Sequence, residues 1–250
     1  AAYAITMPHC PVSTGSRKSL SDALGLKAFA LFRNYRMALF FIFSMFLGVC
    51  LQITNGFANP FITSFQNIDA FKDTFGVQHA NILISLSQMS ETLCILLIPF
   101  FLKRFGIKRV MLLAMLAWVL RYLFFAVGDP GSGVVWFVLS MIVYGVAFDF
   151  FNISGSLFVD KETSLDIRNS AQGLFMMMTN GLGASIGTLS AQMVIDRYVN
   201  SLGANADPMA VWQGWNTCWY IFAGYALVVA VAFAIMFRYK HEPEAVKPVK

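Results

Sequence analysis

Long apolar runs separated by short polar connections are the dominant pattern of this 250-residue chain. A helix needs about 20 apolar residues to cross the hydrocarbon core of a bilayer, and the runs are close to that length. The connections between them are too short to fold as separate domains. The pattern therefore predicts six membrane-spanning helices, at residues 37–61, 79–101, 110–127, 133–159, 171–195 and 213–237.

The composition supports a membrane protein and argues against most enzyme classes. Hydrophobic residues make up 58% of the chain and charged residues 12%, whereas soluble domains are about half apolar and about a quarter charged. The four cysteines have no paired spacing, and the three histidines lie outside the spans or at their ends. The sequence also lacks a GxSxG elbow. We therefore expect no disulfide framework, no metal site, no cofactor and no enzymatic activity.

The net charge of +5 is distributed as in a membrane protein rather than in a nucleic-acid-binding protein. Fifteen of the eighteen Lys and Arg residues flank the predicted spans on one side, Arg121 lies inside a span, and the other side has only Lys72 and Arg197. Basic residues gather on the cytoplasmic side of membrane proteins. The sequence predicts a multi-pass protein in a lipid bilayer with both termini in the cytoplasm and no nucleic-acid partner.

The chain divides into three parts on this interpretation. Residues 1–36 form a cytoplasmic linker without a signal peptide, in which apolar residues at 20–32 have the spacing of a helix lying on the membrane face. Residues 37–237 form the six-helix bundle, and residues 238–250 form a cytoplasmic tail.

Two spans carry polar pairs on one helical face. Glu91 lies in the middle of an apolar run, where an ionisable group costs about 3 kcal/mol on insertion scales and is usually functional. Gln88 lies one turn before it, and Gln52 and Asn55 form a similar pair in the first span. A single amide is more often a contact between helices. Two pairs favour a polar cavity that binds a neutral solute with hydroxyls and ring nitrogens.

The fourth span combines an aromatic stripe with a second acid. Tyr144, Phe148 and Asn152 follow one another at intervals of four, and Asp149 is adjacent to them. Such a stripe is more often core or lipid-facing packing, but rings beside hydrogen-bonding groups also suit a flat heterocycle.

The two intramembrane acids leave alternatives open. Burial disfavours their charged form, which makes Asp149 and Glu91 candidate proton carriers. Asp149 could equally form a permanent ion pair with Arg121, itself more often a structural residue in such a span. In the fifth span, Gly183 and Gly187 form a GxxxG pair that indicates close helix packing, with Asn180 a weaker pocket candidate.

Five stretches resemble a known family over about residues 19–241. The chain is similar to the C-terminal half of the nucleoside:proton symporters, the NupG-type bacterial nucleoside permeases of the major facilitator superfamily. The stretches are LQITNGF (51–57), QHANILISLSQMSETL (78–93), RFGIKRVM (104–111), SMIVYGVAFDFFNISGSLFV (140–159) and AQGLFMMMTNG (171–181).

The resemblance implies an all-α membrane protein whose six transmembrane helices form the C-terminal bundle of a twelve-helix major facilitator fold. It implies proton-coupled uptake of nucleosides such as uridine or adenosine by alternating access in the bacterial inner membrane. The partners would be the nucleoside, H⁺ and a missing N-terminal six-helix half. The implied substrate-binding residues are Gln52, Asn55, Gln88, Glu91, Tyr144, Phe148 and Asp149.

By the same resemblance, Asp149 is the first choice for proton coupling and Glu91 the second. Three alternatives remain: a carrier for another polar solute such as a sugar, a non-transporting membrane receptor or assembly module, and coupling to sodium rather than protons.

Overall fold

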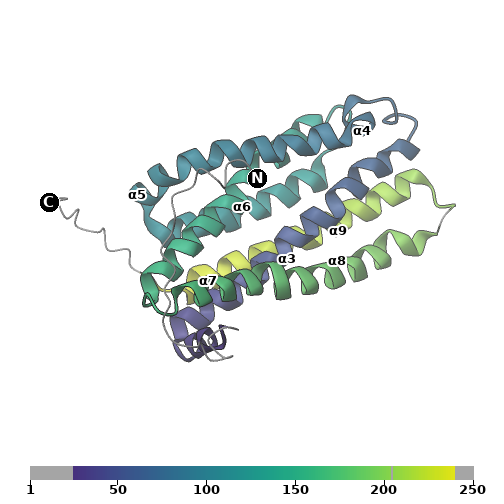
Figure 1. The fold of residues 1–250 in the computed structure, drawn as a ribbon. Coiled ribbons are helices and arrows are strands. Elements are labelled where there is room, and N and C mark those ends of the chain that lie inside the picture. Colours follow the sequence, from purple (N-terminus) through teal and green to yellow (C-terminus); the bar gives the residue numbers. More distant parts are fainter. Residues whose placement is uncertain (1–24, 204, 240–250) are drawn as a thin grey trace, which may run out of the picture.

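The described part of the chain is a bundle of long helices that run alongside one another (Figure 1). A computed structural model describes residues 25–203 and 205–239, and within these ranges the chain forms helices and no strand. The long elements are α3 (Tyr35–Ser64), α5 (Ala80–Val127), α6 (Val134–Glu162), α7 (Arg168–Met176), α8 (Ala184–Tyr198) and α9 (Pro208–Met236). The short ones are η1 (Leu26–Arg33), η2 (Phe65–Asn67), α4 (Phe75–Gln78), η3 (Met177–Gly183) and η4 (Asn200–Leu202).

Four helical stretches of the described residues are long and apolar enough to cross a membrane. They are Tyr35–Asn67, Ala80–Val127, Val134–Glu162 and Pro208–Met236. The prediction of an all-helical, membrane-spanning chain is confirmed at this level.

The longest helix, α5, contains two of the predicted spans. Its backbone is non-helical at Gly106 (φ 76°, ψ 167°), a conformation that glycine adopts readily. A straight helix of 48 residues would be about 72 Å long, but the chain reverses direction and its second part returns alongside the first (Figure 1). The break at Gly106 therefore lies within the connection that the sequence predicted between residues 101 and 110 and reverses the chain there.

The fifth predicted span is α7, the π-helix η3 and α8 in succession. These elements pack on α3. A Cβ atom built on Gly48 would lie 2.1 Å from the carbonyl oxygen of Thr179, and one on Gly183 would lie 2.5 Å from that of Met45. A Cβ on Gly187 would lie 2.9 Å from a Cα of α3. The predicted close packing at Gly183 and Gly187 is confirmed, because only glycine fits at these contacts.

An aromatic core joins α3, α5, α6 and α9. Phe61 of α3 is fully buried, and its ring lies 5.7 Å from Phe125, 5.6 Å from Phe137 and 5.3 Å from Trp219. Edge-to-face and tilted contacts of this kind stabilise aromatic clusters beyond their buried area. The cluster fixes the four helices relative to one another, and with them the polar side chains that α3, α5 and α6 carry.

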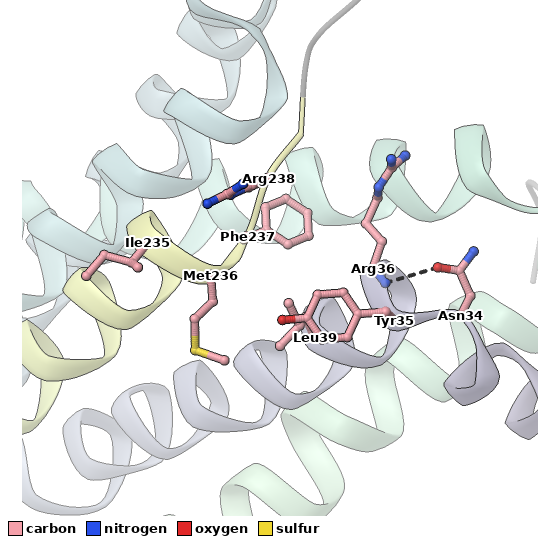
Figure 2. A pocket seen from close by; sticks show the side chains of 8 residues that line it. All are labelled: Asn34, Tyr35, Arg36, Leu39, Ile235, Met236, Phe237 and Arg238. Carbon is pink, nitrogen blue, oxygen red and sulfur yellow. Dashed lines mark hydrogen bonds between the residues drawn. The ribbon is translucent and has the colours of Figure 1, made fainter.

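A cavity of about 680 Å³ lies where α3 begins and α9 ends. Figure 2 shows Asn34 beside it, where its Oδ1 accepts the backbone N–H of Arg36 at 3.0 Å and so caps α3. The Arg36 side chain forms an ion pair with Glu162 at 3.2 Å. None of the seven predicted site residues lines this cavity.

The structure covers only part of the predicted segment on the membrane face. The described residues there form η1, and residues 20–24 lie outside the described part of the chain. At the other end of the bundle, Lys72 donates to Asp69 at 2.8 Å, which lowers the pKa of Asp69 and raises that of Lys72.

Candidate functional site

A cavity of about 310 Å³ opens between α3, both parts of α5, and α6. Its walls carry amides, hydroxyls, one acid and one base, unlike the aromatic core beside it. The lining residues are Thr54, Asn55, Ala58, Asn59, Asn81, Ile84, Ser87, Gln88, Glu91, Arg121 and Tyr144.

The α3 wall is a row of amides. Asn55 and Asn59 are four residues apart, so both side chains leave the same face of the helix. The Asn59 amide donates to Asn81 Oδ1 at 3.3 Å, which joins this wall to the start of α5. The two helices thus hold one continuous polar surface.

Two serines hold the first part of α5 against α6 beside Gln88 and Glu91. Ser87 Oγ donates to the sulfur of Met141 at 3.1 Å, and Ser90 Oγ donates to the carbonyl of Ile142. Gln88 is exposed and Glu91 is half-buried. Their side chains are therefore open to a solute from the cavity.

Tyr144 joins the walls at α6. Its hydroxyl donates to Asn55 Oδ1 at 3.4 Å, and its ring stacks on Phe148 with centroids 5.9 Å apart and an interplanar angle of 1°. Trp118 meets the same ring edge-on at 5.7 Å. The Tyr144 ring is thereby fixed with its polar end at the amide wall.

Arg121 closes the cavity from the second part of α5 and is only 2% exposed. Its Nε–H donates to Thr54 Oγ1 at 3.3 Å and its Nη1 donates to the Ser140 carbonyl at 2.6 Å. Its guanidinium lies 4.3 Å from the centroid of the Tyr144 ring. Among the described residues, no ion pair joins Arg121 to an acid.

Asp149 lies behind the cavity wall, not on it. The side chain is 6% exposed, and its Oδ2 has no hydrogen-bond partner in the described part of the chain. The alternative in which Asp149 forms a permanent ion pair with Arg121 is absent from this conformation. A buried carboxyl group without a partner costs far more free energy when it is charged than when it is neutral.

The structure brings four of the seven predicted site residues together in one cavity: Asn55, Gln88, Glu91 and Tyr144. Phe148 stacks behind Tyr144 and lines a small neighbouring space. Gln52 is half-buried at the contact of α3 with α8, where a Cβ on Gly187 would lie 3.1 Å from its own Cβ. The described residues contain no cluster of His, Cys, Asp and Glu able to hold a metal ion.

Comparison with known proteins shows the family to which the chain belongs. The profile of the nucleoside H⁺ symporters matches residues 1–242. The chain belongs to the nucleoside H⁺ symporter family. It is therefore a multi-pass membrane protein of a transporter family and not an enzyme.

Two relatives from Escherichia coli K12 show how far the similarity extends. The chain is 53% identical to a xanthosine permease over 98% of its own length and 57% of the relative's. It is 54% identical to the nucleoside permease NupG over 96% of its length and 56% of the relative's. The chain thus spans little more than half of the length of these symporters.

The fold is similar to that of a solved symporter. Crystal structures of the nucleoside transporter NupG and of an aspartate-to-alanine mutant match with TM-scores of 0.79 and 0.82. They are 54% and 53% identical to this chain, which covers 57% of each.

Sequence reasoning missed several cavity residues. It treated Arg121 as a structural residue and did not consider Thr54, Asn59, Asn81 or Ser87. Helical spacing carried a signal for two of these, because Asn59 follows Asn55 by four and Asn81 precedes Gln88 by seven. A charge inside a span did mark Arg121, but its place on this cavity depends on the reversal of the chain at Gly106.

Proposed function

We propose that this chain forms the second half of a symporter that takes up nucleosides together with protons by alternating access. The polar cavity at mid-bundle is the observation that carries the proposal. It holds amide, hydroxyl, carboxylate and guanidinium groups within a helical membrane protein of the nucleoside H⁺ symporter family. Such groups can satisfy the hydroxyls and ring nitrogens of a nucleoside.

The proposed architecture has six membrane passes and belongs to a twelve-helix major facilitator fold. The passes are α3, the two parts of α5 on either side of Gly106, α6, the succession α7–η3–α8, and α9. On this view residues 37–237 form the bundle, with a linker at 1–36 and a tail at 238–250. A second six-helix bundle completes the cavity, which is supported by the half-length match to the relatives.

The nucleoside is held by Gln52, Asn55, Gln88 and Glu91, and its base is positioned by rings of α6. Asn55, Gln88 and Glu91 line the cavity, and Gln52 lies one turn before Asn55 on α3. Tyr144 and its stacked neighbour Phe148 offer a flat surface to a heterocycle. The substrates include uridine, adenosine and xanthosine, the last suggested by the name of one relative.

Asp149 binds the co-transported proton and contributes to the substrate site through its neighbour Phe148. Support comes from its burial and from the oxygen that has no partner among the described residues. Loss of the proton would place an uncompensated charge inside the bundle and so shift the balance between outward and inward states.

The proposed location is the bacterial inner membrane, with both termini of the chain in the cytoplasm. The bacterial relatives and the basic residues on one side of the spans support this orientation.

Uptake of radiolabelled uridine by the complete transporter in membrane vesicles tests the proposal. We expect accumulation when the outside is more acidic, and loss of accumulation when the gradient is collapsed. Absence of uridine uptake under any gradient, with uptake of a labelled sugar instead, would overturn the nucleoside assignment. Uptake that follows a sodium gradient and ignores pH would overturn proton coupling.

A further inference from the structure

Arg121 is buried among neutral partners from two neighbouring helices, α3 and α6. It binds Thr54 on α3 and the Ser140 carbonyl on α6, while Ser140 Oγ donates back to the Arg121 carbonyl at 3.0 Å. A guanidinium that is only 2% exposed, and without an acid in contact among the described residues, is costly to bury. Packing alone does not explain the burial of this guanidinium.

One reason is the orientation of Tyr144. The Arg121 guanidinium lies over the face of this ring at 4.3 Å, and the hydroxyl of the same ring bonds Asn55. A cation over an aromatic face contributes about 0.5–2 kcal/mol, with the larger values where water is excluded. Arg121 therefore fixes the ring that the proposed base site uses.

A second reason is the charge of Glu91. Among the described residues that line the cavity, Glu91 is the only acid and Arg121 the only base. They interact electrostatically across the cavity but do not form an ion pair in contact. The carboxylate is thus compensated while its oxygens stay free to accept hydrogen bonds. Asp149, behind the wall, keeps an oxygen without a partner.

We propose that Arg121 is a positioning residue for the substrate: it holds Tyr144 in place and compensates Glu91 at a distance, so that Glu91 serves as an acceptor for the nucleoside. The inference rests on the proposed function. It also gives the two acids different roles. Glu91 shares its cavity with a fixed positive charge, whereas Asp149 does not line that cavity.

The test compares Arg121→Gln and Arg121→Lys in the complete transporter, reconstituted in liposomes, using uridine counterflow without a pH gradient. We expect Arg121→Gln to raise KM about tenfold, because the Tyr144 ring and the Glu91 carboxylate are both misplaced, and to keep Vmax within about twofold of the unmodified protein. Arg121→Lys keeps the charge and should raise KM only about threefold. The matched control is Arg197→Gln, which removes an exposed charge at the end of α8 and should leave KM unchanged.

A double-mutant cycle separates this from a purely structural arginine. If Arg121 compensates Glu91, then Glu91→Gln should raise KM less in the Arg121→Gln background than in the unmodified protein. Independent effects that simply multiply, or an unchanged KM in Arg121→Gln, would overturn the inference. If Arg121→Gln fails to reach the membrane, Arg121→Lys and Thr54→Val replace it in turn, each alone and combined with Glu91→Gln. An unchanged KM in both of these single variants overturns the inference.

Two experimental outcomes distinguish the proposed function from the proposed role of Arg121. If the unmodified transporter does not exchange uridine, the proposed function falls and this inference falls with it. If it exchanges uridine and the Arg121 variants behave like Arg197→Gln, only the role of Arg121 is wrong.

Discussion

Glu91 and Asp149 look alike in the sequence, but their surroundings differ. Glu91 is half-buried on a cavity that also contains a guanidinium, whereas Asp149 is 6% exposed and has one oxygen without a partner among the described residues. A compensated, accessible carboxylate is suited to binding a polar ligand. An uncompensated, buried one is suited to gaining and losing a proton. Glu91 is therefore suited to binding the substrate, and Asp149 is suited to carrying the proton.

Asp149→Asn should separate proton coupling from substrate movement. The amide resembles the protonated acid, so the variant cannot change charge during the cycle. We expect uridine accumulation driven by a pH gradient to fall about tenfold or more, while counterflow without a gradient stays within about twofold. Accumulation in Asp149→Asn at the unmodified level would exclude this residue as the proton carrier.

Glu91→Gln should weaken substrate binding. A hydrogen bond to a charged group contributes about 1.5–3 kcal/mol, which corresponds to a rise in the Kd for uridine of about tenfold or more. Calorimetry on the purified complete transporter measures this Kd. Ser85→Ala is the control, because Ser85 Oγ bonds the carbonyl of Ile82 in its own helix and does not line the cavity. Equal Kd values for the two variants would contradict the substrate role of Glu91.

At the scale of elements, hydrophobic length predicted where helices lie better than where they bend. The predicted run 213–237 lies almost wholly within α9, because length and apolarity are properties of the run itself. The sequence predicted the connection between residues 101 and 110, but not that a single non-helical residue, Gly106, would make it. The π-helix η3 was not predicted either, since both features depend on how neighbouring helices pack. The same reasoning applies to the site: Gln88 and Glu91 show their shared face in the sequence, and Arg121 does not.

Gly48→Ala should destabilise the contact between α3 and η3. The added methyl would lie 2.1 Å from the carbonyl oxygen of Thr179, so the helices must move apart. Overpacking of this kind costs about 1–3 kcal/mol. Thermal unfolding of the purified protein in detergent should show a lowered Tm. Gly224→Ala in α9 is the matched control, because nothing lies within 4 Å of its new Cβ, and its Tm should be unchanged or raised.

At the scale of the whole molecule, charge and topology agree. Arg109 lies just after the reversal in α5, and Arg197 lies at the end of α8. Figure 1 places these two regions at opposite ends of the bundle. The basic residues of the described part of the chain concentrate at the end that carries Arg109, as expected for the cytoplasmic side.

Labelling of single cysteines tests this orientation. Cys50, Cys94 and Cys218 are buried and are replaced, with Cys10, before Arg109→Cys or Arg197→Cys is introduced. We expect a membrane-impermeant maleimide added to intact cells to label Arg197→Cys and to label Arg109→Cys only after the membrane is opened. The reverse pattern would invert the proposed topology.

The place of Arg121 has a consequence for how the protein is made. One of its partners, Thr54, is synthesised before it, but Ser140 emerges 19 residues after it. The acceptor from α6 is therefore in place only once α6 has packed against the second part of α5. We expect the tight reversal at Gly106 to let this part of α5 insert as a hairpin with the first part, next to the amide-rich face of the cavity.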